Sequence, residues 1–133
     1  MRKNKKISLL FLFSILLMTL FGCGQSSLAK VDILTRIEET PKIFWGVKND
    51  TRLFGLTNIE TRKVEGFDID IALAITEEIL GPEGEAVFVE VTSKTRIPLI
   101  KNGNIDAIIA TMTISEERLK QVDFSDVYFD AGQ

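Results

Sequence analysis

The chain contains no histidine and only one cysteine, Cys23. Histidine is the usual general base and a frequent metal ligand, while disulfides and thiolate metal sites need several cysteines. The sequence therefore excludes an internal disulfide framework and argues against zinc sites and against Ser-His or Cys-His catalysis. It also lacks Gly-x-Gly-x-x-Gly and Gly-Lys-Ser/Thr phosphate loops. We accordingly expect no metal and no nucleotide cofactor.

Positive charge is scarce beyond the amino terminus. Residues 1–22 hold four of the 16 basic residues and no acid, so residues 23–133 carry 12 basic against 19 acidic residues, a net charge of −7. Nucleic acid binding depends on a basic surface that neutralises phosphates. We therefore expect no nucleic acid partner.

The first 22 residues have the pattern of an export signal. A basic start is followed by an apolar run over 7–21 and by Gly22-Cys23. This run is shorter than the roughly 20 residues that a membrane span needs, so a signal peptide is favoured over an uncleaved anchor helix. Residues 20–23 resemble the lipobox of bacterial lipoproteins, although Phe21 is bulkier than the usual residue. The resemblance implies a lipidated Cys23 that anchors the protein to the outer face of a membrane.

Residues 23–41 are predicted to form a tether that includes a short helix within 28–37. Beyond this tether, strand and helix patterns alternate, and a hairpin-like excursion is predicted over 54–66. Short apolar runs predict core strands, and capped amphipathic runs predict helices. The predicted strands are 43–47, 86–91 and 106–110, with 126–130 as a candidate fourth strand. The predicted helices begin near Asp68, at Ser93 or Thr95, and after Ser115, the last running to about Val122.

This order predicts an α/β fold with a mainly parallel sheet and helices on both of its faces. In the longest helix, Asp68 or Asp70 is expected to cap the amino end, and the buried face is expected to contain the four residues Ile71, Ala72, Ile75 and Ile79. The aromatic residues expected in the core are Phe44, Trp45, Phe67 and Phe88. Loops that follow parallel strands meet at one edge, where such sheets bind ligands. The three loops that this rule selects are 48–52, 92–96 and 111–118.

Four segments resemble successive motifs of the bacterial extracellular solute-binding proteins of family 3, which bind polar amino acids for ABC importers. They are Gly66-Phe-Asp-Ile-Asp-Ile-Ala72, residues 96–103, residues 105–118 and Gln121-Val-Asp-Phe-Ser125. The resemblance implies a type II periplasmic-binding-protein-like fold with two lobes. Residues 42–133 would form part of lobe 1, and the second lobe would be missing, so this chain is expected to be truncated and to hold half of the pocket.

The resemblance also assigns roles around the last loop. Arg118 occupies the position of the arginine that grips the α-carboxylate, and a guanidinium fork fits both carboxylate oxygens. The backbone N–H of Thr113 would be a further donor. Carbonyl or hydroxyl oxygens of Thr111 and Thr113 would accept from the α-ammonium.

The other two loops would recognise the side chain of the ligand. Ser93 and Arg96 resemble the pair that holds the distal carboxylate in glutamate and aspartate binders, and Lys48 lies where glutamate binders carry a base and glutamine binders an acid. Three positive charges favour glutamate or aspartate, with glutamine next. Each residue has an alternative: Lys48 as a solvated residue with Arg52 as its rival, Ser93 as a helix cap, and Arg96 in a surface pair with Glu90.

The sequence thus predicts a solute-binding lipoprotein that delivers an amino acid to the permease subunits of an ABC transporter. We expect a binding protein and not an enzyme. Two alternatives remain open. One is a dehydratase-like enzyme on the same fold, although no acid–base pair is evident. The other is an amino acid sensor domain.

Overall fold

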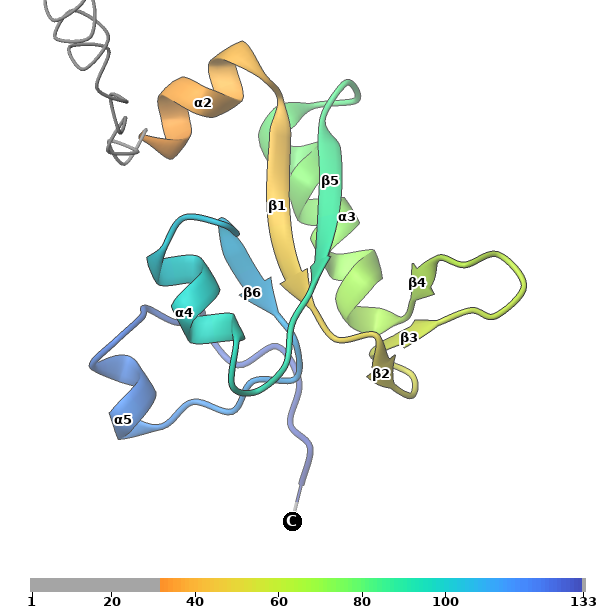
Figure 1. The fold of residues 1–133 in the computed structure, drawn as a ribbon, viewed down its shortest axis with the longest axis vertical. Coiled ribbons are helices and arrows are strands. Elements are labelled where there is room, and N and C mark those ends of the chain that lie inside the picture. The colour runs from red at the N-terminus through yellow and green to blue at the C-terminus, as the bar shows by residue number, and fades with distance from the viewer. Residues whose placement is uncertain (1–31, 133) are drawn as a thin grey trace, which may run out of the picture.

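A computed structural model describes residues 32–132. Its centre is a three-stranded sheet in the order β5 (Glu85–Glu90), β1 (Lys42–Val47) and β6 (Ala107–Ile109). β1 pairs in parallel with both neighbours, and all three strands end at the same edge of the sheet (Figure 1). The predicted α/β class with a parallel sheet is confirmed.

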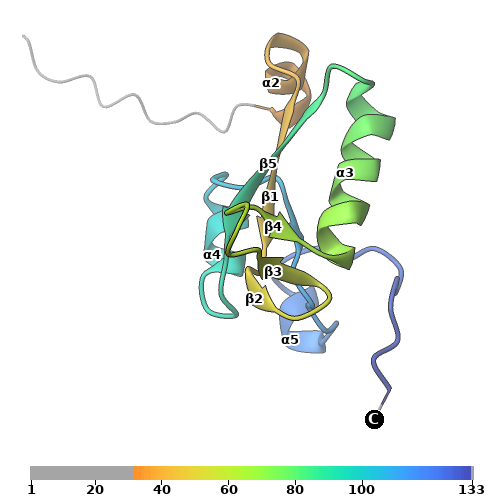
Figure 2. The ribbon, with the colours of Figure 1, turned by 90° about the vertical axis from the view of Figure 1, so that its right-hand side faces the viewer.

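Both faces of this sheet are covered. α3 (Phe67–Leu80) lies on one face and α4 (Arg96–Lys101) on the other (Figure 2). Strand side chains alternate between two cores, as the two-residue period of a strand requires. Ile43, Trp45, Val47 and Ile109 pack with Ile69 and Ala72 of α3, while Val91, Ile105 and Ala110 pack with Leu99 and Ile100 of α4.

The buried face of α3 differs from the predicted one. Its buried residues are Asp68, Ile69, Ala72 and Thr76, whereas Ile75 and Ile79 are 37% and 58% exposed. Thr76 faces inward because its hydroxyl accepts a 2.9 Å hydrogen bond from Nε1 of Trp45, and it donates in turn to the carbonyl of Ala72. Buried polar groups need partners, and this requirement sets the rotation of the helix.

The predicted excursion after β1 is a small antiparallel sheet. It consists of β2 (Asp50–Thr51), β3 (Gly55–Thr57) and β4 (Val64–Glu65), and it projects from the body of the molecule (Figure 1). The side-chain oxygen of Asn58 accepts from the N–H groups of Glu60 and Thr61 and fixes the turn, as asparagine does in Asx turns.

α2 (Ile33–Glu39) lies where the strands begin, away from the edge at which they end. Arg36 of α2 forms an ion pair with Asp106, and its guanidinium lies 5.0 Å from the centre of the Phe44 ring. The predicted signal peptide, Cys23 and the first residues of the expected leading helix lie outside the described residues. Within residues 32–132, no helix has the length and apolar character that crossing a membrane demands.

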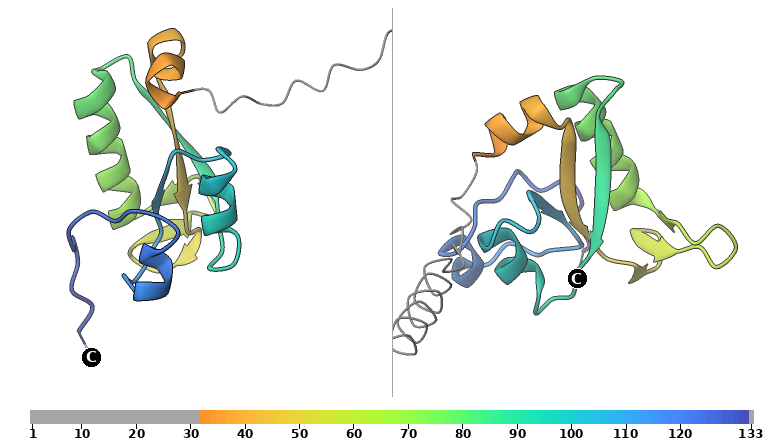
Figure 3. Two further views of the ribbon diagram at one scale, coloured as in Figure 1. Left: turned by 90° about the vertical axis from the view of Figure 1, so that its left-hand side faces the viewer. Right: turned by 45° about the horizontal axis from the view of Figure 1, so that its top comes forward.

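The end of the chain departs from two predictions. α5 (Glu116–Leu119) is shorter than the expected helix to Val122, and residues 126–130 form no strand. Aromatic contacts hold this segment instead: Phe129 packs at 4.9 Å on Phe54, which also contacts Phe67. Phe67 was expected in the core, but it lies in this aromatic cluster and is 42% exposed. The segment passes beside the beginning of α3 (Figure 3).

Candidate functional site

The candidate site lies at the edge where the three parallel strands end. β1 leads into Lys48, β5 into residues 91–95, and β6 into residues 110–115 (Figure 1). The three predicted loops therefore meet as expected, because neighbouring parallel strands bring their carboxyl ends together.

Arg96 is the most unusual residue of this edge. It is only 4% exposed, and its Nη1 donates a 3.0 Å hydrogen bond to the carbonyl of Ala110. Its Nε has no hydrogen-bond partner, and no acid within the described residues forms a salt bridge with it. Burial lowers the pKa of Arg96, and the nearby charge of Arg118 lowers it further. The alternative of a surface pair with Glu90 is therefore wrong.

Arg118 lies on the other side of the same loop. Ser115 caps α5 as predicted, because its hydroxyl accepts from the N–H of Arg118 at 3.4 Å. The half-buried Arg118 side chain reaches back, and its Nη1 donates to the carbonyl of Thr113 at 2.6 Å. Two guanidinium groups are thus fixed by the two ends of the loop 110–113. A pair of neighbouring cations with unused donors is suited to an incoming carboxylate.

Thr111 and Thr113 present exposed side chains at this loop. Thr111 has a φ of +48°, which is uncommon for a β-branched residue. Its N–H donates to Oδ2 of Asp68 at 3.1 Å and is thereby engaged within the protein. The carbonyl of Thr113 already accepts from Arg118. The hydroxyl groups of both threonines are the more accessible acceptors.

Asp68 is a component of the site that the sequence reasoning missed. It is fully buried, with 0% exposure, and it also accepts a 3.0 Å hydrogen bond from the hydroxyl of Tyr128. Burial raises its pKa, and the bonds from Tyr128 and Thr111 oppose that rise. The burial of Tyr128 and its contact with Asp68 raise the pKa of Tyr128 as well.

The predicted capping of α3 by Asp68 or Asp70 is wrong, because the N-cap is Gly66 and no side chain caps the helix. The N–H groups of Phe67 and Asp68 donate to the carbonyls of Leu53 and Phe54, so the first turn of α3 needs no side-chain cap. Gly66 makes this contact possible, because its φ is +141° and an added Cβ would lie 2.5 Å from the carbonyl oxygen of Phe54.

Lys48 has a partner of its own. Its Nζ lies 2.8 Å from Oδ1 of Asp50, and this contact lowers the pKa of Asp50. The Lys48 side chain is 16% exposed, so it is not the freely solvated residue of the alternative interpretation. Its positive charge is balanced within the loop, in contrast to that of Arg96.

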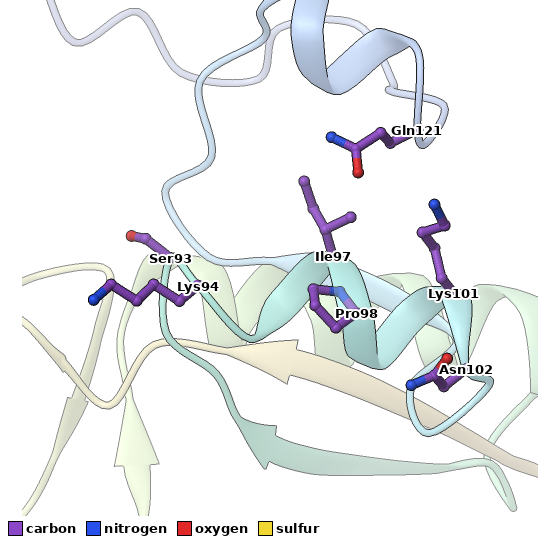
Figure 4. A pocket seen from close by; sticks show the side chains of 7 residues that line it. All are labelled: Ser93, Lys94, Ile97, Pro98, Lys101, Asn102 and Gln121. Carbon is purple, nitrogen blue, oxygen red and sulfur yellow. The ribbon is translucent and has the colours of Figure 1, made fainter.

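Ser93 lies in the loop before α4 but does not cap the helix. The N-cap is Thr95, whose hydroxyl accepts from the N–H of Thr92 at 2.9 Å. Ser93 and Lys94 lie at one end of a groove of about 440 Å³ between α4 and Gln121, where Ile97 points toward Gln121 (Figure 4). The lining of this groove includes neither Arg96 nor Arg118. Within residues 32–132, no three acidic or cysteine side chains gather into a group that could hold a metal ion.

Comparison with known proteins identifies the family. Residues 43–133 match the bacterial extracellular solute-binding proteins, family 3. The chain belongs to this family. It is 55% identical over 138 residues to the ABC transporter glutamine-binding protein GlnH of Bacillus subtilis, covering 100% of this chain and 50% of that protein. It is 61% identical over 105 residues to the glutamine-binding protein of Geobacillus stearothermophilus, covering 79% of this chain and 40% of that protein.

A solved structure confirms the fold of the solute-binding family. Domain 1 of TmArgBP in its arginine-bound form aligns with a TM-score of 0.67 and 37% identity, covering 73% of this chain and 74% of that one. The chain spans about half the length, or less, of the curated relatives it matches.

Proposed function

We propose that this protein binds a polar amino acid, glutamine in the first place, for an ABC importer. The observation that carries the proposal is the guanidinium pair at the loop 110–113. Among the residues that the structure describes, Arg96 is buried without an acidic partner, and Arg118 lies close enough to lower its pKa. A buried, unpaired charge is destabilising unless a ligand supplies the counter-charge. The α-carboxylate of an amino acid does so.

Glutamine is favoured over the glutamate or aspartate that the charge count suggested. That count treated Lys48, Arg96 and Arg118 as free charges, but Asp50 balances Lys48. The remaining pair suits one carboxylate and leaves no separate cation for a second. The two relatives described above at 55% and 61% identity are glutamine-binding proteins, which supports the same choice.

The proposed role is binding and not catalysis. Asp68, the buried acid at this edge, has both carboxylate oxygens engaged by Thr111 and Tyr128. It is therefore poorly placed to exchange protons with a ligand. The domain 1 structure of TmArgBP, which holds arginine, supports ligand binding by a single lobe. Export follows from membership of an extracellular family, and anchoring through Cys23 follows from the lipobox resemblance.

Calorimetric titration of the purified protein with glutamine, glutamate, aspartate and arginine tests the proposal. We expect glutamine to bind more tightly than the other three. Equal or tighter binding of glutamate would contradict the choice of glutamine, and no heat with any of the four would contradict amino acid binding by this chain.

Substitution of Arg118 by alanine tests the carboxylate contact. Loss of a hydrogen-bonded charge pair lowers affinity by about 2–5 kcal/mol, so glutamine binding should weaken by roughly 30-fold or more. Lys120→Ala is the matched control, because it removes the same charge from an exposed position two residues away. If both variants lose affinity equally, the effect comes from overall charge and not from the Arg118 contact.

A further inference from the structure

We propose that Asp68 is a positioning residue that fixes the loop 110–113 in the shape that binds the ligand. The inference rests on the proposed function for its ligand, but its structural basis is independent of which amino acid binds. Asp68 belongs to α3, whereas the loop follows β6 on the sheet. One carboxylate oxygen of Asp68 accepts from the N–H of Thr111 at 3.1 Å.

The position of Thr111 within the loop makes this bond important. The carbonyl of the preceding residue, Ala110, accepts from Arg96, and the carbonyl of Thr113 accepts from Arg118. Asp68 therefore holds the backbone between the two carbonyls that orient the guanidinium pair. The N–H of Thr111 belongs to the same peptide group as the carbonyl of Ala110, so a rotation of this peptide would turn the acceptor of Arg96 directly.

The bond to Asp68 stabilises a backbone conformation of Thr111 that is otherwise unfavourable. Thr111 has a φ of +48°, a backbone region that is unfavourable for a β-branched residue. A hydrogen bond to a charged group is stronger than one between neutral groups, so the bond to Asp68 opposes this strain. Asp68 is also unable to turn away, because its side chain is fully buried. Its second oxygen accepts the separate hydrogen bond from Tyr128.

Asparagine and alanine at position 68 separate this role from simple packing. In Asp68→Asn, the amide oxygen can accept from Thr111 while the NH₂ group donates to the phenol oxygen of Tyr128. Asp68→Ala removes both bonds. We expect Asp68→Asn to bind glutamine within about threefold of the unaltered protein and Asp68→Ala to bind at least tenfold more weakly, since about 1.4 kcal/mol is a factor of ten.

Thr76→Val is the matched structural control. Thr76 is a second buried polar residue of α3, 2% exposed, and its bonds to Trp45 and Ala72 lie away from the loop. This variant should unfold at lower denaturant concentration yet keep its affinity for glutamine. An affinity loss in Thr76→Val as large as that in Asp68→Ala, or an unchanged affinity in Asp68→Ala, would overturn the inference.

A measurement without ligand keeps the inference testable if no amino acid binds. Hydrogen exchange of the Thr111 amide, followed by NMR, reports its bond to Asp68 directly. Protection should be lost in Asp68→Ala and retained in Asp68→Asn and Thr76→Val. Should Asp68→Ala fail to fold, Tyr128→Phe replaces it: Thr111 must remain protected, because only the second bond of Asp68 is removed. Loss of Thr111 protection in Asp68→Asn or Tyr128→Phe would contradict the proposed arrangement.

Discussion

At the scale of single residues, Arg96 combines a position in the candidate site with a cost in stability. Its guanidinium is buried, its Nε has no hydrogen-bond partner among residues 32–132, and Arg118 lies nearby with the same charge. Replacing a buried, poorly paired charge with an apolar residue of similar volume is often stabilising. Arg96→Met should therefore raise the free energy of unfolding of the ligand-free protein by about 1 kcal/mol, with the lost bond to Ala110 offsetting part of the gain.

Denaturant unfolding of Arg96→Met beside Arg118→Met provides the comparison. Both variants should lose glutamine binding, but only Arg96→Met should gain stability, because Arg118 is half-exposed and its charge remains partly solvated. A lower unfolding midpoint for Arg96→Met would mean that the bond to Ala110 contributes more than burial of the charge costs.

The carboxyl of Asp68 gives a pH dependence of defined sign. Burial raises its pKa in the folded protein above the ordinary value of 3.8. At pH values between 3.8 and this raised pKa, the carboxyl of Asp68 holds a proton in the folded state that it has released in the unfolded state. The contribution of Asp68 to stability therefore falls as pH rises through this window.

Asp68→Asn does not titrate and isolates this contribution. The free energy of unfolding of the variant, minus that of the unaltered protein, should increase as pH rises above 3.8 and then level off. Denaturant unfolding of both proteins over this range measures the difference, in which the other carboxyl groups cancel. A difference that does not change with pH would show that Asp68 has the same pKa in both states.

Arg118, which was predicted as a site residue, and Asp68, which was missed, differ in how far along the sequence their hydrogen-bond partners lie. Arg118 was predicted from the resemblance of residues 105–118 to a family motif, and its acceptor Thr113 is only five residues away. The partners of Asp68 are 43 and 60 residues away. Nothing next to Asp68 in the sequence indicates them, and an acid in the first turn of a helix has a local explanation as a cap. Long-range hydrogen bonds of this kind need the folded structure.

At the scale of elements, local sequence predicted the strands of the sheet well and the orientation of α3 less well. The strands were predicted because each has a short apolar run and both faces of the sheet are covered. The predicted inward face of α3 was right for Ala72, which is buried, and for Ile71, which packs against the core. It was wrong for Ile75 and Ile79, which are exposed, because apolar residues occur on several sides of this helix. The helical period of the sequence does not show which of two apolar faces is buried. The hydrogen bond between the buried side chains of Trp45 and Thr76 determines which face of α3 points inward.

The loop after β1 contains the ion pair of Lys48 and Asp50. Asp50 balances Lys48 at 2.8 Å, so Asp50→Asn should leave a net positive charge beside the candidate site. We expect the affinity for glutamate to rise relative to that for glutamine by about two- to fivefold, the modest size reflecting the exposure of Asp50. Glu60→Gln, which removes the same charge in the distant turn of the hairpin, is the control.

Parallel calorimetric titrations of these variants with both amino acids measure the ratio of affinities. The shift should shrink as salt is added, because the effect is electrostatic and reaches the ligand through solvent. An unchanged ratio in Asp50→Asn would remove Lys48 from the group of residues that recognise the ligand side chain.

At the scale of the whole molecule, α2 and the candidate site lie at opposite ends of the sheet. α2 lies at the end of the sheet where the strands begin, held by the contacts of Arg36 with Asp106 and Phe44, whereas Arg96 and Arg118 lie where the strands end. Residues that precede α2 therefore join the described domain at the end opposite the candidate site.

This arrangement gives the prediction of a lipidated Cys23 a functional consequence. Mass spectrometry of protein extracted from membranes should show a diacylglycerol-modified amino terminus at Cys23, with residues 1–22 removed. Cys23→Ser should abolish the modification and release the protein from the membrane fraction, because one lipid-bearing residue supplies the anchor. Glutamine affinity should be unchanged in the released variant, since the site lies at the far end of the domain. An unmodified Cys23 in membrane-bound protein would contradict the anchor, and a loss of affinity on release would contradict the separation of anchor and site.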